Sequence, residues 1–359
     1  MLGEISETTF KWLDERLSLS AVASAAGKKK VPLHKQSFWY YMGGIAMLLL
    51  AVQFLTGILL MVYYIPELSS ANSSVLFINS QIDFGWFVRS MHSWGANILI
   101  FVLFAHMFSA YFMKAYRKPR ELTWISGLAL LMLCFGFGFT GYLLPWDEVA
   151  FFATKIGIDI AEQVPLIGGI LANLLRGGSE VGQGTLSRFF LVHVIVLPLG
   201  LFAIAGIHLL LVQLHGMSEP KSFQEQAPEK KKYEMFFPDF FMKDLMVWLL
   251  AFNVLATIVI LFPWGVGPEA DPFAAAPAGI KPEWYFLGMF QFLKLLPAHI
   301  GFIEGEKVGL LIFALIGGIF AAAPFIDKGE NPKLSMFFDI YGLMILIGLI
   351  AFTIWGYLA

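Results

Sequence analysis

Four histidines lie at spacings that suit the binding of a metal centre. His92 and His106 are 14 residues apart and His193 and His208 are 15 apart, each pair within one apolar run. On an α-helix, 14 residues rise about 21 Å and leave the second side chain some 40° behind the first. Fifteen residues rise about 22 Å and overshoot by about 60°. Each pair therefore shares one face of its helix, with its members at different depths.

Two imidazoles at each depth suit a haem iron better than a bare metal ion. The second and fourth apolar runs carry the pairs and cross a membrane in the same direction, so His92 lies level with His193 and His106 with His208. Neither level offers a carboxylate, which disfavours a simple ion. A lone intramembrane histidine is often only a polar packing residue. Four in register predict two bis-histidine b-type haems, which have no open position and suit electron transfer.

The composition indicates that a bilayer surrounds these helices. Hydrophobic residues make up 58% of the 359 residues and charged residues 14%, and the mean hydropathy is +0.72. Soluble domains average about 45–50% apolar and about 25% charged residues. A net charge of −2 gives no reason to expect nucleic acid as a partner. The only cysteine, Cys134, excludes a disulfide within the chain and reads as a core residue.

Seven runs without Asp, Glu, Lys or Arg are long enough to cross the hydrocarbon, which needs about 20 residues. We therefore predict an all-α, polytopic membrane protein with seven transmembrane helices. The predicted spans are 36–66, 90–113, 122–146, 189–218, 245–268, 308–326 and 340–359. A shorter apolar stretch, 163–175, is expected to lie at the interface.

Lysine and arginine predict the orientation of the chain. Seventeen of the 24 fall in the N-terminal arm and the loops on its side of the membrane. The positive-inside rule then places the N-terminus on the cytoplasmic, negative side of a cell inner (plasma) membrane. The longest loops, about 147–188 and 269–307, lie on the positive side, and loops of this length are usually functional.

The chain divides into four predicted regions. They are an N-terminal arm at 1–35, a four-helix di-haem domain at 36–218, a linker loop at 219–243, and a three-helix C-terminal domain at 244–359. The run Lys230-Lys231-Lys232 marks the linker.

Glycines on two further helices repeat the spacing of the histidines. Gly43 and Gly57 are 14 residues apart, as are Gly127 and Gly141. Glycine lets a flat macrocycle come close to the backbone, although close helix–helix contact explains these glycines equally well.

Several segments now resemble cytochrome b of the bc and bf quinol-oxidising complexes, over nearly the whole chain. The segment 11–17, KWLDERL, resembles the amphipathic N-terminal helix of cytochrome b6. The segments 141–147, GYLLPWD, and 185–190, TLSRFF, look like the end of the third span and the start of the fourth. Pro282-Glu283-Trp284-Tyr285 matches the PEWY motif of the quinol-oxidising pocket. The 15-residue histidine spacing and the seven spans resemble the bf type, with cytochrome b6 and its small subunit (subunit IV) fused.

The resemblance implies that quinol is oxidised near the positive side. One electron passes to a Rieske iron–sulfur protein, and the other crosses two haems to a second quinone pocket. His92 and His193 are expected to hold the positive-side haem and His106 and His208 the negative-side haem. The implied partners are the Rieske protein, a c-type cytochrome, quinone, membrane lipid and a second copy of the complex.

The motif match also assigns roles at the quinol-oxidising site. Glu283 is expected to take a proton from quinol, since burial can raise the pKa of a carboxyl into a useful range. The residues expected to shape the pocket are Tyr142, Pro145, Pro282, Trp284 and Tyr285. Arg89 is expected to pair with a haem propionate, and Arg188 has a similar claim, although either could be a plain surface arginine.

Two departures from the family pattern concern the cofactors. Tyr41 stands where the chloroplast type has the cysteine that holds an extra haem, so we expect no covalent c-type haem. Ser109 stands where family members usually have an arginine. Lys114 and Arg117 are then the candidates for the counter-ion of the negative-side haem.

The negative-side quinone pocket departs from the pattern as well. Gln213 replaces an arginine of the chloroplast type. His215 could donate a proton there, or it could be an ordinary interfacial histidine.

Two other functions remain open from the sequence. A di-haem anchor of another quinone-linked dehydrogenase would share the histidines but rarely needs the PEWY segment. A transporter whose histidines relay protons would share the intramembrane polar residues. The visible spectrum of a reduced bis-imidazole haem would exclude the transporter, and quinol-dependent reduction sensitive to a positive-side inhibitor would exclude the anchor.

Overall fold

The computed structural model describes residues 2–18, 20 and 27–359, and seven of its helical segments are long and apolar enough to cross a membrane. This confirms the predicted all-α membrane fold. The segments are η1 (Ser37–Tyr40) with α3 (Tyr41–Met61), α5 (Gly85–Phe112), α6 (Glu121–Leu143), α9 (Gln183–Leu191) with the π-helical turn η2 (Val192–Val196) and α10 (Leu197–His215), η4 (Phe236–Phe240) with α12 (Phe241–Leu261), α14 (Gly305–Ile326) and α15 (Pro332–Leu358).

The observed helices differ from the predicted runs at their ends. α12 includes Lys243 and Asp244, although the predicted run begins at 245. α15 begins at Pro332, eight residues before its run. The backbone hydrogen bonds of a helix continue through charged residues, so a run defined by the absence of charge marks the hydrocarbon-facing part better than the helix end.

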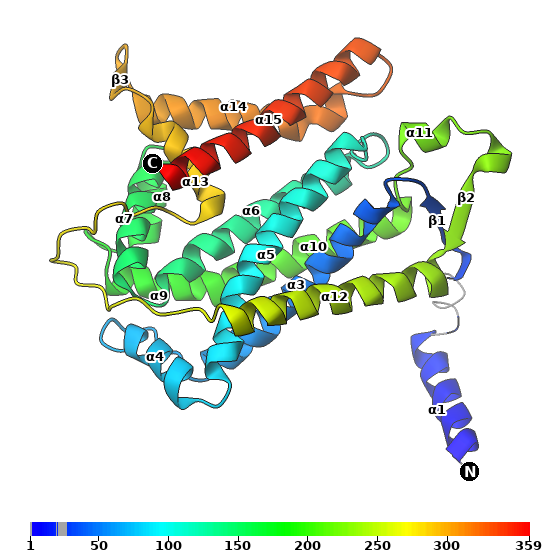
Figure 1. Ribbon diagram of the computed structural model, residues 1–359, viewed down its shortest axis with the longest axis horizontal. Helices are drawn as coiled ribbons and strands as arrows, with labels where there is room; N and C mark the ends of the chain where they lie inside the picture. The colour runs from blue at the N-terminus through cyan, green and yellow to red at the C-terminus, as the bar shows by residue number, and fades with distance from the viewer. Residues whose placement is uncertain (1, 19, 21–26) are drawn as a thin grey trace.

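Four segments form a bundle, and three pack around it. α3 packs against α5, and α10 packs against α6. α12 lies along α3 and α5, whereas α14 and α15 form a separate layer beside α5 and α6 (Figure 1). The bundle therefore joins the two helices that carry histidines to the two that carry the repeated glycines.

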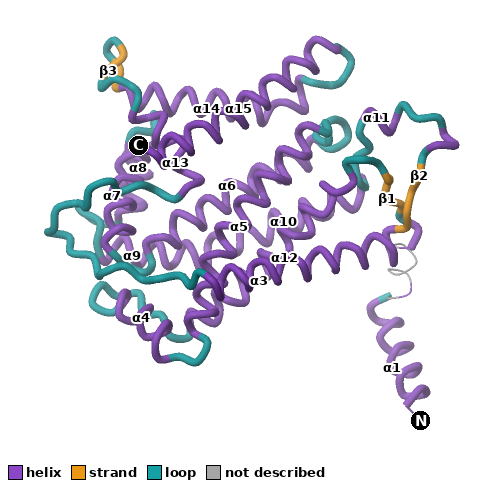
Figure 2. Tube along the Cα trace, viewed as in Figure 1, coloured by secondary structure: helices purple, strands orange, loops and turns teal. Residues whose placement is uncertain are grey.

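Shorter elements cover the two ends of the bundle (Figure 2). One end, called here the α7 end, carries α4 (Ala71–Gln81), α7 (Glu148–Glu162), α8 (Gly168–Arg176) and the loop before α13 (Trp284–Lys294). A hairpin of β3 (His299–Ile300) and β4 (Ile303–Glu304) follows α13. The predicted interfacial stretch, 163–175, forms a turn and most of α8.

The opposite end, called the β1 end, ties the N-terminal arm to the predicted linker. β1 (Lys30–Leu33) pairs antiparallel with β2 (Lys232–Met235). The linker also contains α11 (Lys221–Gln224) and the short turn η3 (Pro228–Lys230). In Figure 1, α1 (Leu2–Leu17) stands apart from the bundle at this end.

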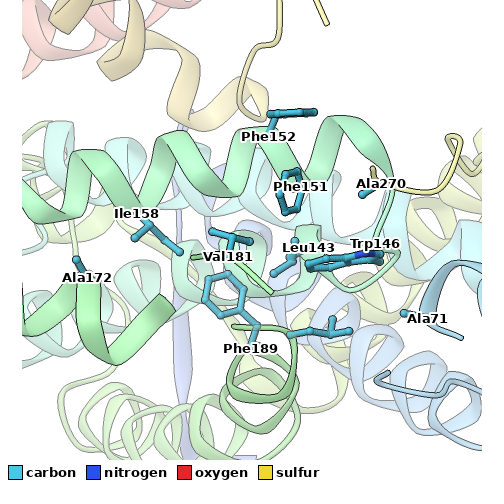
Figure 3. Packing of buried hydrophobic residues seen from close by; sticks show 11 residues of the cluster. Ala71, Leu143, Trp146, Phe151, Phe152, Ile158, Ala172, Val181, Phe189 and Ala270 are labelled. Atoms are coloured by element: carbon cyan, nitrogen blue, oxygen red, sulfur yellow. The ribbon is translucent and has the colours of Figure 1, made fainter. Parts of the chain in front are cut away.

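A cluster of buried apolar side chains fixes the α7 end. Trp146 and Phe151 contact edge to face, with ring centroids 5.4 Å apart. Figure 3 shows these rings beside Leu143, Val181 and Phe189, so α6, α7 and α9 share one core. Ala71 and Ala270 extend the cluster to α4 and to the loop before α13. This core holds the loops that carry the candidate site.

A second cluster joins the bundle to the outer layer at the β1 end. Tyr111 of α5 stacks on Phe320 of α14, with ring centroids 4.5 Å apart. Beside it, fully buried Asp327 accepts hydrogen bonds from Tyr116 at 2.5 Å and Arg117 at 2.8 Å. Burial alone would raise the pKa of Asp327, but hydrogen bonds from Tyr116, Arg117 and Ser335 lower it to about 2. The Asp327 carboxylate therefore links the α14–α15 turn to the α5–α6 turn through an ion pair and hydrogen bonds.

Candidate functional site

The histidines of α5 and of the α9–η2–α10 segment face each other inside the bundle. The ring centroids of His92 and His193 are 6.3 Å apart. A metal between two imidazoles needs about 4 Å between the coordinating nitrogens, since each bond is about 2 Å long, which puts the ring centres about 6 Å apart. The spacing therefore fits one metal centre held from both sides.

Each of the four predicted glycines faces one imidazole. A Cβ atom on Gly57 would lie 3.3 Å from the Cε1 atom of His92, and a Cβ on Gly141 would lie 2.6 Å from that of His193. The corresponding distance is 3.4 Å from Gly43 to His106 and 3.2 Å from Gly127 to His208. The glycines thus make room for the rings of the histidines, and they repeat the 14-residue interval because the rings do.

Hydroxyl groups fix the tautomer of three imidazoles. Nδ1 of His92 lies 2.9 Å from the hydroxyl of Thr56, and Nδ1 of His193 lies 3.1 Å from that of Thr140. Each threonine donates its own proton to a backbone carbonyl one turn earlier. The hydroxyl must therefore accept from Nδ1–H, which leaves the Nε2 lone pair free to bind a metal.

The same arrangement is only half complete at the other level. The Ser126 hydroxyl lies 3.0 Å from Nδ1 of His208 and donates to the Thr123 carbonyl. His106 faces Gly43, which follows Met42 and not a hydroxyl residue. These hydroxyl partners were not predicted, although a Ser or Thr directly precedes three of the four glycines.

A π-helical turn explains how a 15-residue spacing fits a level arrangement. The backbone N–H of Leu197 donates to the carbonyl of Val192, five residues earlier. Pro198 lacks an N–H for the carbonyl of Val194, which favours this irregularity. A π turn takes up one extra residue, so the expected 60° overshoot between His193 and His208 becomes the same offset as in α5.

The donor set fits haem better than a bare ion. No group of three or more His, Cys, Asp or Glu side chains that could hold a metal occurs within 2–18, 20 and 27–359. Cys134 is buried on α6 without a disulfide. A flat macrocycle supplies iron with four ligands, and two facing imidazoles with free Nε2 atoms would supply the remaining two. The residues at the His92–His193 level thus fit a bis-histidine haem.

The PEWY segment opens α13 at the α7 end, where α5 and α6 hold it. The indole Nε1 of Trp284 donates to the Asn97 side chain of α5 at 2.8 Å. The ring of Tyr285 stacks on Phe135 of α6 at 6.1 Å. The Tyr285 hydroxyl fills the space left by Gly138, where a Cβ atom would overlap it. Asn97 and Gly138 were not predicted.

Glu283 lies at the N-terminal end of α13, half buried, and its carboxylate makes no hydrogen bond or ion pair with another described residue. Burial raises its pKa above the ordinary value. Burial also raises the pKa of Tyr285, and the nearby charges of Glu283 and Tyr142 add to that rise. The structure therefore brings Tyr142 and Tyr285 close to Glu283, whose carboxyl can change its protonation state.

The end of α6 forms the other wall of this site. Tyr142 is half buried, and the carbonyl of Pro145 accepts a hydrogen bond from Asn72 of α4 at 3.1 Å. Asp147 caps α7 by accepting from the N–H of Ala150 at 2.9 Å. Asn72 and the backbone of α7 therefore hold this loop from two sides.

The two predicted arginines have protein partners. Arg89 is buried and donates to the carbonyls of Trp264 at 2.7 Å and Gly265 at 2.9 Å. Arg188 is exposed and donates to the carbonyls of Asn173 and Leu174, in the last turns of α8. Arg89 remains close to the His92 level, whereas Arg188 serves as a helix cap.

The residues predicted for the β1 end, namely Gln213, His215, Lys114 and Arg117, do not come together as one site. Gln213 accepts a hydrogen bond from Lys29, and Nδ1 of His215 is buried without a partner among the described residues. Lys114 pairs with Asp339 at 2.7 Å and Arg117 with Asp327 at 2.8 Å, so both candidate counter-ions are engaged.

One unpredicted carboxylate lies near the His106 level. Asp244 of α12 points at Gly44 of α3, the neighbour of the glycine that faces His106. Its Oδ1 atom has no hydrogen-bond partner among the described residues, and neither has the indole nitrogen of Trp248 beside it. Tyr41 stacks on Phe240 nearby, with ring centroids 5.0 Å apart.

Comparison with known proteins identifies related chains. Residues 28–216 match the family described as cytochrome b/b6/petB, and residues 269–359 match cytochrome b (C-terminal)/b6/petD. A cytochrome bc complex cytochrome b subunit of Chlorobaculum thiosulfatiphilum is 45% identical over 95% of this chain and 79% of its own length. The menaquinol:cytochrome c reductase cytochrome b subunit of Geobacillus thermodenitrificans is 42% identical over 59% of this chain and 97% of its own. A solved structure, hyperthermophilic respiratory Complex III, has a TM-score of 0.83 at 29% identity and covers 97% of this chain and 91% of that one.

Proposed function

Because this chain belongs to the cytochrome b/b6 family, we propose how its residues carry out the work of that family. The chain is the membrane-embedded cytochrome b subunit of a complex that oxidises quinol and transfers electrons. The observation that carries the residue assignments is the facing pair His92 and His193, 6.3 Å between ring centroids. The two alternative functions, a proton-relaying transporter and an anchor of another dehydrogenase, do not agree with membership in this family.

The family implies haem b and a quinone as ligands. We propose two haems, one between His92 and His193 and one between His106 and His208, and no covalent c-type haem. When bound, the haems supply one-electron carriers at two depths of the membrane. The protein's part is to present unprotonated Nε2 atoms, which is supported by the hydroxyls of Thr56, Thr140 and Ser126.

Glu283 is the proposed proton acceptor for quinol at the α7 end. A carboxylate without a partner can take the proton of a quinol hydroxyl, and burial favours the protonated product. The carboxyl can then release the proton to water beyond the pocket. Tyr142, Pro145, Pro282 and Tyr285 enclose the quinol, and Trp284 fixes the segment through Asn97.

Arg89 and residues of the β1 end have supporting roles in this proposal, namely charge neutralisation and proton delivery. Arg89 places a buried positive charge one helical turn from His92, where a haem propionate would be neutralised. Arg188 has the weaker claim to the same role because α8 uses its guanidinium. At the β1 end, His215 and Asp244 have unpartnered polar atoms that could deliver protons to a quinone being reduced.

Membership in a bc-type complex implies partner subunits and an integral membrane location. We further propose a Rieske iron–sulfur protein and a c-type cytochrome as partners, and a homodimer of the complex. The N-terminus and the β1 end would lie on the cytoplasmic side of the plasma membrane. The concentration of 17 of the 24 lysines and arginines on that side supports this orientation.

Spectroscopy of the purified complex tests the proposal. Quinol should reduce two b-type haems with bis-imidazole spectra, and His193→Ala should remove one of them and abolish quinol oxidation. His299→Ala, which changes an exposed histidine on β3, is the control and should leave both haems in place. Retention of both haems in His193→Ala would overturn the assignment.

A further inference from the structure

A large groove lies between α5 and α15, outside the four-helix bundle. Its volume is about 1300 Å³, above the roughly 300–1,000 Å³ of a site for a drug-sized molecule. α5 contributes a stripe of four phenylalanines, and α15 contributes an apolar face opposite. The lining residues of these two faces are Phe101, Phe104, Phe108, Phe112, Leu346, Leu349, Ile350 and Ile354. The groove therefore suits a long apolar ligand.

The depth of the groove matches one leaflet. The stripe from Phe101 to Phe112 spans 11 residues of helix, about 17 Å. Half of a hydrocarbon core about 30 Å thick is about 15 Å. The stripe ends at Phe112, the last residue of α5. This end of α5 lies at the β1 end of the bundle (Figure 1). Acyl chains of one leaflet would reach from that turn to the level of Phe101.

Positive charge gathers where the groove opens at the β1 end. Six basic residues line it, namely Lys114, Arg117, Lys118, Arg120, Lys221 and Lys328, against two acidic ones, Glu219 and Asp339. Lys114 and Arg117 are already paired with Asp327 and Asp339. Among the described residues, Lys118, Arg120 and Lys328 form no ion pair.

The two arginines of this opening also have unused donors. Nε of Arg117 and Nε of Arg120 are both buried without a hydrogen-bond partner in the described chain. The Nη2 atom of Arg120 is directed to the carbonyls of His215 at 2.9 Å and Met217 at 3.3 Å, which holds the side chain in place. An anionic oxygen would satisfy such donors better than a neutral one.

We propose that this groove is a binding site for one anionic phospholipid of the leaflet at the β1 end. Its phosphate lies among Lys118, Arg120 and Lys328, and its acyl chains lie along the phenylalanine stripe of α5. Because Lys118 and Arg120 belong to the α5–α6 turn and Lys328 to the α14–α15 turn, the lipid bridges the bundle and the outer layer. Trp284 of the PEWY segment also lines the groove, but the binding of the lipid needs none of the redox chemistry proposed above.

Native mass spectrometry of the delipidated, intact complex tests the site. Titration with phosphatidylglycerol should load one tightly held copy per chain, and phosphatidylcholine should not compete. Lys118→Gln with Lys328→Gln should weaken that copy by about 30-fold, as the loss of two lysines near an anionic headgroup implies. Lys230→Gln with Lys232→Gln removes two exposed charges at the same end, outside the groove, and should change nothing.

A second variant tests the apolar part without changing charge. Ile350 is half exposed and lines the groove, so Ile350→Trp should displace the acyl chains and release the same copy. Equal retention of phosphatidylglycerol in the lysine pair and in Ile350→Trp overturns the proposal. So does equal binding of phosphatidylcholine, or the finding of a quinone or a partner helix in the groove. Haem content, measured in parallel, should stay at the wild-type level in all variants.

Discussion

The two imidazole levels are built from the same two helical segments, yet they are held differently. At the α7 end both imidazoles bond to a threonine hydroxyl, and Gly141 leaves almost no spare room for His193. At the β1 end only His208 has a hydroxyl partner, and Gly43 stands further from His106. The difference indicates that the level at the α7 end, beside the proposed quinol-oxidising site, is the more rigid one.

The glycines provide the largest test of this comparison. Gly141→Ala puts a Cβ atom 2.6 Å from Cε1 of His193, so the imidazole must move and the α7-end haem should be lost with most of the quinol oxidation. Gly43→Ala places its Cβ at 3.4 Å from His106, an ordinary contact, and should keep both haems. Haem content per chain and the reduced spectrum measure both variants. Equal haem loss in the two would contradict a difference in rigidity.

The second largest effect is expected from loss of the proposed proton acceptor, which should slow the reaction at the α7 end but not the one at the β1 end. Glu283→Gln should slow quinol oxidation by about 10- to 100-fold, at or below the lower end of the roughly 10²–10⁴-fold that a general base contributes. Burial raises the pKa of Glu283, so in the wild type the rate should rise with pH as the carboxyl ionises above its ordinary range. The variant should lose that rise and still reduce quinone at the β1 end. Glu180→Gln, an exposed change near α8, is the control, and a pH profile unchanged in Glu283→Gln would argue against proton acceptance.

The hydroxyl partners give the smallest expected effect. Thr140→Val removes an acceptor from Nδ1–H of His193, which makes the imidazole a weaker base and should raise the midpoint potential of the α7-end haem. A hydrogen bond of about 0.5–1.5 kcal/mol corresponds to about 20–60 mV for one electron. Met42→Thr should lower the potential of the β1-end haem by adding the missing hydroxyl. Redox titration of both variants measures the shifts, and a shift of the wrong sign in either would remove the hydroxyls from the account.

The sequence was informative wherever the site depends on one helix at a time. The histidine and glycine intervals follow from helical periodicity, and the PEWY residues are contiguous, so both could be identified without a structure. Thr56, Thr140 and Ser126 escaped because their roles depend on how one helix is rotated against another. Charge-free runs predicted the spans but missed the helix ends, since the backbone ladder continues past the hydrocarbon.

Contacts between segments far apart in the chain could not be predicted from the sequence. The tie from Arg117 to Asp327 joins residues 210 positions apart, and nothing near either residue indicates the other. The pairing of β1 with β2 turned a predicted linker into an ordered connection. Arg89 was expected to meet a propionate, and its bonds to the carbonyls of Trp264 and Gly265 could not be anticipated from a loop without regular structure.

The π-helical turn at Val192–Val196 has a consequence for how such chains can change over time. A codon lost from this stretch would let the turn relax to an ordinary helix, with both imidazoles still at their depths. A codon lost between His92 and His106 would swing one ring about 100° off the shared face. Deletion of one residue should therefore be tolerated between His193 and His208 and eliminated between His92 and His106.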